Sequence, residues 1–169
     1  MNATLQVWNE ADQATALDAM IACCAARRWA AGMVALRPIA SVFELSEAAD
    51  RIWSTMEEPD WMEAFTAHPR IGDRKPAHAT AKSAAWSTQE QSSTNSAAEK
   101  VLEELAQGNA LYEERFGFTY IVCATGKSAD EMLAILNRRL SSDRASELRE
   151  AAEQQRQITQ IRLGKWLIE

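Results

Sequence analysis

Only one stretch of the chain has the composition of a β-strand, and this limits the folds that its 169 residues can adopt. Residues 116–126 are rich in aromatic and β-branched side chains, which are typical of strands. A single strand has no partner for its backbone N–H and C=O groups. We therefore expect an extended, partly buried segment lying among helices, and an all-α fold. If this segment borders a cavity, its backbone groups can serve a ligand.

Helix start signals recur along the rest of the chain. A capping box places a side chain such as Ser three residues before Glu, so that both satisfy backbone N–H groups of the first turn. Sequences of this type begin at Ser41, Asp60, Ser87 and Ser128. Asn9 followed by Asp12 gives a further N-cap with an acid in the first turn. Apolar residues at helical spacing follow these starts and support them. The same spacing predicts a short helix over residues 28–36 and a last helix over about 142–167.

The size and charge of the chain narrow its class of function. A chain of 169 residues, 47% of them hydrophobic, suits one domain over residues 1–169 with a real core. The net charge is −6, and no basic tract is long enough to follow a phosphate backbone, so we expect no nucleic-acid partner. No signal peptide is recognisable, and no apolar stretch approaches the roughly 20 residues that cross a bilayer. We expect a cytoplasmic protein with no membrane partner.

The cysteines and histidines argue against a disulfide framework and a structural zinc site. Cys23 and Cys24 are adjacent and Cys123 is distant, an odd set that favours a reducing compartment. The two histidines lie ten residues apart without neighbouring cysteine ligands, so we expect no metal. Cys123 paired with His68 is an alternative nucleophile, although buried structural cysteines are commoner. His78 lies in a polar stretch where solvation is expected.

His68 stands at the point where a helical pattern stops. Pro69 disfavours helical geometry at the residue before it, and Gly72 permits a backbone turn. The short segment therefore gathers an imidazole, the guanidinium of Arg70 and backbone N–H groups. These residues fit a polar helix exit without chemistry, and they fit a catalytic turn equally well.

Two other charged residues also allow a structural and a functional interpretation. Glu90 can close a capping box, or it can orient or deprotonate His68 beside a helix N-terminus that binds anions. In the second case Ser87 and Gln91 would point into the same space. Arg162 lies on or beside the apolar stripe of the last helix. It can be a structural arginine, or it can clamp a carboxylate or ureido group.

Taken together, these motifs resemble those of the OHCU (2-oxo-4-hydroxy-4-carboxy-5-ureidoimidazoline) decarboxylase family of urate degradation. The matching elements are Trp29, Arg37-Pro38-Ile39-Ala40-Ser41, His68-Pro69-Arg70-Ile71-Gly72, Ser87-x-x-Glu90-Gln91, Leu105-Ala106-x-x-Asn109-x-x-Tyr112-x-x-x-Phe116-Gly117 and Arg162-Leu163. They span nearly the whole chain, and the element beginning at His68 is the most specific. No proposed catalytic position departs from the family pattern. The C-terminus lacks the peroxisomal address of eukaryotic members, which suggests a bacterial-type cytoplasmic version.

The resemblance implies a single-domain helical bundle whose extended segment lines the active-site cleft. It implies an enzyme without cofactor or metal, usually a homodimer, that converts the small molecule OHCU to (S)-allantoin and CO₂. His68 would be the catalytic proton donor and Glu90 its partner. The implied substrate contacts are Pro69, Ser87, Thr88, Gln89, Gln91, Tyr120, Ile121, Val122, Cys123, Ala124 and Arg162. A helical interaction domain without activity and a thiol hydrolase using Cys123 are the competing interpretations.

Overall fold

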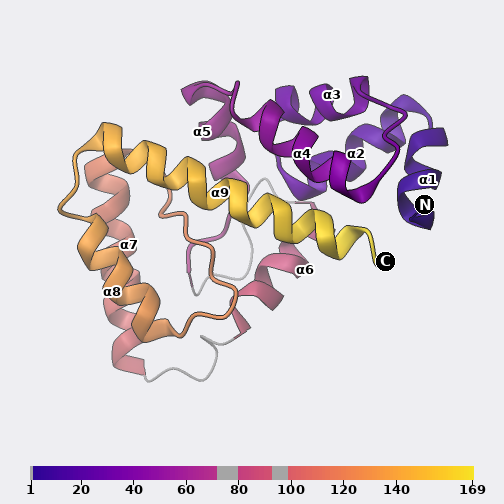
Figure 1. Ribbon diagram of the computed structural model, residues 1–169. Coiled ribbons are helices and arrows are strands. Elements are labelled where there is room, and N and C mark those ends of the chain that lie inside the picture. Colours follow the sequence, from indigo (N-terminus) through magenta and orange to yellow (C-terminus); the bar gives the residue numbers. More distant parts are fainter. Residues whose placement is uncertain (1, 72–79, 93–98) are drawn as a thin grey trace. The chain divides into compact units, whose positions relative to one another are not determined.

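The computed structural model describes residues 2–71, 80–92 and 99–169. These residues contain helices and no strand, which confirms the all-α prediction (Figure 1). In the same residues no helix is long and apolar enough to cross a membrane. The predictions for Gly72, the polar stretch that follows it and His78 lie outside the described residues.

The first of two compact units comprises Met1–Ala64 and Arg156–Glu169. Its helices are α1 (Ala3–Glu10), α2 (Gln13–Cys23), α3 (Arg27–Ala35), α4 (Val42–Trp53), the larger part of α5 (Glu58–Thr66) and the end of α9 (Arg144–Trp166). Helix α3 packs against both α2 and α4. The fully buried Trp29 ties α3 to α4 because its indole N–H donates to the Ala49 carbonyl at 3.1 Å.

The helix starts of this unit confirm some capping predictions and correct others. Ser41 caps α4, as predicted. Asp12 caps α2, but Asn9 lies inside α1, where its side-chain amide bonds both backbone groups of Ile39 instead. The predicted start at Asp60 is wrong by two residues. Helix α5 begins at Glu58, and the Asp60 carboxylate accepts the Glu57 N–H from within the first turn.

The second unit comprises Phe65–Gln155. Its complete helices are α6 (Ala81–Glu90), α7 (Glu99–Phe116) and α8 (Ala129–Arg139). Helices α7 and α8 pack side by side (Figure 1). They approach closely at Gly108, where a Cβ would lie 2.5 Å from the Leu136 side chain. The reciprocal capping box predicted from Ser128 to Glu131 is present at the start of α8.

The predicted helix start at Ser87 is wrong. Helix α6 begins at Ala81, and its N-cap is Thr80, whose side chain accepts the Ser83 N–H. Ser87 therefore lies inside the helix, and Glu90 is its last residue. The expected anion site at a helix N-terminus does not exist here, because the C-terminal end of a helix carries the negative end of the dipole. Two residues three apart share a helix face anywhere in a helix, so the pattern alone did not locate the start.

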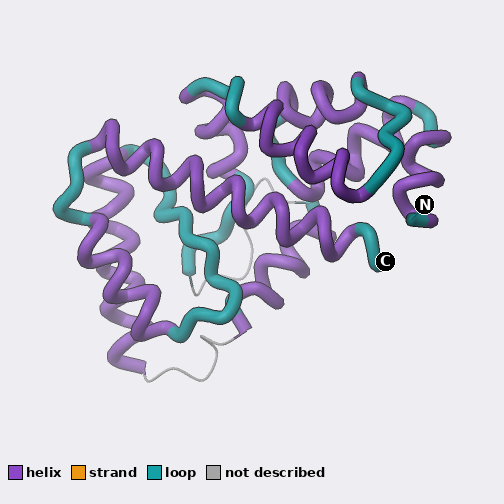
Figure 2. The backbone as a smooth tube through the Cα atoms, viewed as in Figure 1, coloured by secondary structure: helices purple, strands orange, loops and turns teal. Residues whose placement is uncertain are grey.

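Between α7 and α8 the chain has neither helix nor strand over residues 119–124, as predicted (Figure 2). Gly117 opens this segment with φ at +81°, which a residue with a Cβ rarely adopts. Side chains from Tyr120 to Ala124 are all buried. Tyr112 on α7 packs against the rings of Phe116, Phe118 and Tyr120, with centroid separations of 4.7–5.7 Å. The segment is therefore held within the core of the second unit.

Candidate active site

His68 lies two residues beyond the end of α5, where its backbone N–H donates to the Phe65 carbonyl at 3.1 Å. The side chain is half-buried and the following Pro69 is buried. Its Nε2 atom lies 2.6 Å from the Oε1 atom of Gln155 on α9. Because a glutamine carbonyl oxygen only accepts, this hydrogen bond requires the proton on Nε2. A half-exposed imidazole that is held in one orientation suits acid–base chemistry.

Arg70 anchors the His68 turn to α7. Its guanidinium forms two hydrogen bonds with the Glu113 carboxylate, both 2.7 Å long. An exposed pair of this kind stabilises a protein by about 1 kcal/mol or less, but bidentate geometry fixes orientation. A pocket of about 610 Å³ adjoins the pair, and its lining residues are Arg70, Ile71, Ala106, Asn109, Ala110, Glu113 and Glu114. The buried amide of Asn109 has no hydrogen-bond partner among the described residues.

The extended segment has part of its backbone already engaged by side chains of the same unit. Arg139 donates to the Ile121 carbonyl at 2.6 Å, and Gln154 accepts the Cys123 N–H at 2.8 Å. Lys127 donates to the Cys123 carbonyl at 2.7 Å. The N–H and C=O groups of Val122, which is 5% exposed, have no partner among the described residues. Backbone hydrogen bonds to a ligand are therefore expected at Val122 first.

A buried ionic cluster is hydrogen-bonded to the backbone of this segment. Arg139 pairs with Glu147, and the Tyr112 hydroxyl donates to the same carboxylate. Each of the three side chains is at most 1% exposed. Burial, and then the hydrogen bond to Glu147, raises the pKa of Tyr112 well above its usual range. The cluster leaves one guanidinium nitrogen of Arg139 for the Ile121 carbonyl, so it determines where the segment lies.

The residues predicted around Glu90 differ in exposure. Ser87 is buried, whereas Glu90 and Gln91 are half-buried at the end of α6. Thr88 and Gln89 are exposed, and the Thr88 hydroxyl donates to the Ala84 carbonyl within the helix. Ser87, Glu90 and Gln91 therefore have the burial expected of groups that line a site, whereas the other two residues do not.

Arg162 lies in the first unit, on the buried face of α9, and is 2% exposed. It is close enough to Cys24 for its charge to act on that thiol. Burial raises the pKa of Cys24 to about 11, although a Thr159 hydrogen bond and the Arg162 charge oppose this shift. Because burying a guanidinium is costly unless it is paired, Arg162 is a partnered core residue and not a solvated surface arginine.

Sequence reasoning missed four residues of the second unit: Gln154, Gln155, Arg139 and Glu147. A signal for Gln155 was present, because it precedes Arg162 by seven residues, a spacing at which two side chains share a helix face. Arg139 and Glu147 stand at buried positions that α8 and α9 contribute to the core, yet their charge made them resemble surface residues.

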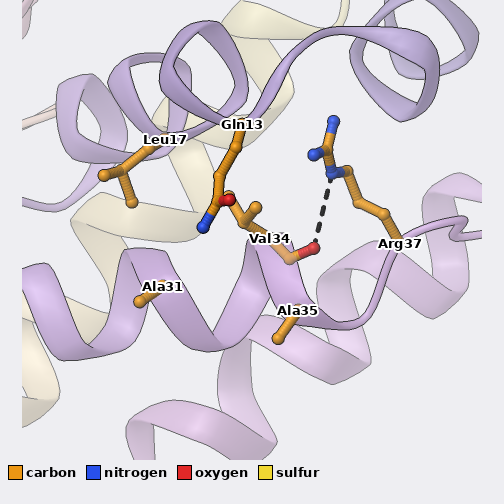
Figure 3. A pocket seen from close by; sticks show the side chains of 6 residues that line it. All are labelled: Gln13, Leu17, Ala31, Val34, Ala35 and Arg37. Carbon is orange, nitrogen blue, oxygen red and sulfur yellow. Dashed lines mark hydrogen bonds between the residues drawn. The ribbon is translucent and has the colours of Figure 1, made fainter.

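A second pocket, of about 310 Å³, lies in the first unit and is less suited to catalysis (Figure 3). Among the described residues that line it, Arg37 alone is charged. Figure 3 shows the guanidinium turned toward the Val34 carbonyl, and its Nη1 atom donates to the carbonyls of Trp8 and Ala11 at 2.7 Å each. Arg37 therefore closes the C-terminal end of α1 and is not available as a ligand anchor.

Comparison with known proteins gives consistent matches. A protein-family model, OHCU decarboxylase, matches residues 9–164. The uric acid degradation bifunctional protein TTL of Arabidopsis thaliana is 37% identical over 85% of this chain. The chain spans only 44% of the length of that protein. The 2-oxo-4-hydroxy-4-carboxy-5-ureidoimidazoline decarboxylase of Haloferax volcanii is 26% identical over 96% of this chain and 95% of its own length.

The fold also matches a solved structure. The crystal structure of an OHCU decarboxylase in the presence of (S)-allantoin has a TM-score of 0.77 and 33% sequence identity to this chain. The match covers 90% of this chain and 99% of the other. The structural likeness therefore extends over both compact units, as the sequence match does.

Proposed function

Because the chain belongs to the OHCU decarboxylase family, we propose that it is a carboxy-lyase that converts OHCU to (S)-allantoin and CO₂ in urate degradation. The observation that carries this proposal is the family match over residues 9–164 together with the geometry at its most specific motif. There His68 is half-buried, and its Nε2 atom lies 2.6 Å from the Oε1 atom of Gln155.

The reaction can proceed without a cofactor, and none is part of the proposal. The carboxylate of OHCU is attached to a carbon beside a ring C=N bond. When the C–C bond breaks and CO₂ leaves, its electron pair passes toward that C=N bond. The protein then has to shield the carboxylate from water and deliver a proton to one face of the ring. One placed acid and a few binding groups can do this.

His68 is the proposed proton donor, and Glu90 is its proposed partner. Glu90 ends α6, where the helix dipole and the carboxylate both favour a nearby cation. An imidazolium at His68 would gain from both. This interpretation, with a cation beside the C-terminal end of α6, replaces the anion site at a helix N-terminus that the sequence had suggested.

The proposed substrate contacts follow the family pattern. They are Pro69, Ser87, Thr88, Gln89, Gln91, Tyr120, Ile121, Val122, Cys123, Ala124 and Arg162. The contacts from the extended segment are supported by its burial and by the unpartnered backbone of Val122. The guanidinium of Arg162 suits a carboxylate or ureido group. Thr88 and Gln89 are the least supported of these contacts, because both residues are exposed. We further propose that residues 1–169 work as one domain in a cytoplasmic homodimer.

Turnover of freshly generated OHCU tests the activity. The purified protein should speed the appearance of allantoin and make it (S), which circular dichroism of the nascent product reports. Loss of OHCU at the spontaneous rate, with racemic allantoin, would contradict the proposal.

Glu90→Gln separates two roles of this carboxylate. If Glu90 supports the imidazolium of His68, its removal should lower kcat by about 10-fold or more and leave KM nearly unchanged. Glu104→Gln is the matched control, because it makes the same substitution at an exposed position of α7 and should change neither kcat nor KM. A change in KM alone would mean that Glu90 binds substrate and does not assist proton transfer.

Alkylation tests the competing thiol mechanism. All three cysteines are buried, and burial raises the pKa of Cys24 to about 11. Iodoacetamide at pH 8 should therefore label none of them in the folded protein and leave turnover of OHCU unchanged, because the thiolate is the reactive form. Mass spectrometry counts the adducts, and urea-unfolded protein, which should gain three, is the control. Labelling of Cys123 with loss of activity would favour the thiol hydrolase.

A further inference from the structure

Two adjacent glutamines of α9 hold the two separate pieces of the candidate site in the second unit. Gln155 bonds the imidazole of His68, which follows α5. Gln154 bonds the backbone N–H of Cys123, in the extended segment between α7 and α8. Consecutive residues of an α-helix point about 100° apart, so one turn can reach two different neighbours. These contacts link the proton donor and the ligand-facing backbone to a single rigid element.

The orientation of the Gln154 amide is set by a second hydrogen bond. Its Nε2 atom donates to the Glu150 carboxylate at 3.2 Å, one helical turn earlier. The Oε1 atom is thereby left to accept the Cys123 N–H. Lys127 holds the carbonyl of the same residue at 2.7 Å, so both backbone groups of Cys123 are fixed by side chains. The neighbouring peptide groups of Val122 are fixed in turn, because they belong to the same short segment.

Gln155 is chemically suited to orient an imidazole that must release a proton. The side chain is 1% exposed, so its amide is shielded from water. Its carbonyl oxygen accepts from Nε2 of His68, which keeps the proton on that nitrogen and the ring in one orientation. Because Glu90 is already the proposed anionic partner, a second carboxylate in the place of Gln155 would bind the imidazolium too strongly and oppose proton release. A neutral acceptor holds the ring without this opposition.

We propose that Gln155 is a positioning residue that fixes the ring orientation and tautomer of His68 through the hydrogen bond at Nε2, while Gln154 sets the backbone of the extended segment against the same turn of α9. The inference rests on the proposed function for the role of that imidazole, but the contacts themselves can be tested without turnover. Neither glutamine has to touch the substrate for this role.

Imidazole NMR tests the Gln155 contact directly, since the chain has only two histidines. In protein with ¹⁵N-labelled histidine, His68 should give a resolved Nε2–H signal, because a hydrogen-bonded, sheltered proton exchanges slowly with water. His78→Asn assigns that signal by elimination. Gln155→Met keeps the length of the side chain and removes the acceptor, so the signal should disappear. Gln155→Glu should restore it. Gln107→Met, the same substitution at an exposed position of α7, should leave it unchanged.

Kinetics with OHCU test the role. Gln155→Met should lower kcat by about 10- to 100-fold with little change in KM, the range found when the orienting partner of a metal-bound histidine is removed. Gln155→Glu should recover the signal but not the rate, because its charge retains the proton. Gln154→Met should mainly raise KM, because it frees the ligand-facing backbone. Gln107→Met is again the control.

The two proposals fail in different ways. If Gln155→Met keeps both the Nε2–H signal and kcat, the positioning role is overturned although the decarboxylase activity stands. If the wild-type protein does not accelerate OHCU turnover but the signal responds as described, the proposed function is overturned and the contact is supported. Should Gln155→Met fold poorly by far-ultraviolet circular dichroism, Gln155→Glu decides: a wild-type rate in that variant overturns the role.

Discussion

His68→Asn should lower kcat for OHCU by about 10²- to 10⁴-fold, the usual contribution of a placed general acid. Asparagine retains a polar side chain at the turn but has no proton to transfer near neutral pH. KM should change little, because all the proposed binding groups except the adjacent Pro69 lie elsewhere, on α6, the extended segment and α9. Stopped-flow absorbance gives the rate, and circular dichroism gives the chirality of the allantoin formed. Residual product should be closer to racemic, since protonation would then come from water.

His78→Asn is the matched control, because it makes the same substitution at the chain's only other histidine. It should leave both the rate and the product chirality unchanged. Wild-type activity in His68→Asn would remove His68 from the mechanism, whatever its contact with Gln155. An intact rate with lost chirality would instead place His68 at the stereochemical step alone.

The fold class could be predicted from the sequence because its determinants are local. The boxes beginning at Ser41 and Ser128 start helices as expected, and the single β-like stretch did not become a strand. Ser87 shows where local reasoning fails. Its pattern with Glu90 is also satisfied by two neighbours on one helix face, and Thr80 provides the actual cap seven residues earlier. Several capping candidates in one polar stretch cannot be ranked without knowing which helix face is buried.

The candidate site was predictable only where a motif marks it. His68 is marked by the proline that follows it, and the extended segment by its composition. The supporting residues lack such marks. Arg139 stands in the last turn of α8, where basic residues are common because they complement the helix dipole. Its burial and its partner Glu147, eight residues away across a helix break, follow from tertiary packing, which the local pattern does not contain.

Arg139→Met should destabilise the protein by about 3–5 kcal/mol, the usual cost of removing one partner of a buried ion pair. The loss leaves the Glu147 carboxylate buried without its cation and the Ile121 carbonyl without its donor. Urea unfolding followed by circular dichroism measures the free energy of unfolding. Arg138→Met is the matched control, because it makes the same change at the exposed neighbouring position and should shift that free energy by less than about 0.5 kcal/mol.

The double variant Arg139→Met, Glu147→Leu separates the stability of the cluster from its positioning role. Removing both charges should recover much of the lost free energy, because replacing a buried ion pair by apolar side chains is often nearly neutral. The Ile121 carbonyl still lacks its donor in this variant, so the extended segment is not held in place and kcat/KM for OHCU should stay low. If kcat/KM recovers together with stability, the cluster is structural only. If Arg139→Met is as mild as Arg138→Met, the buried pair does not stabilise the fold.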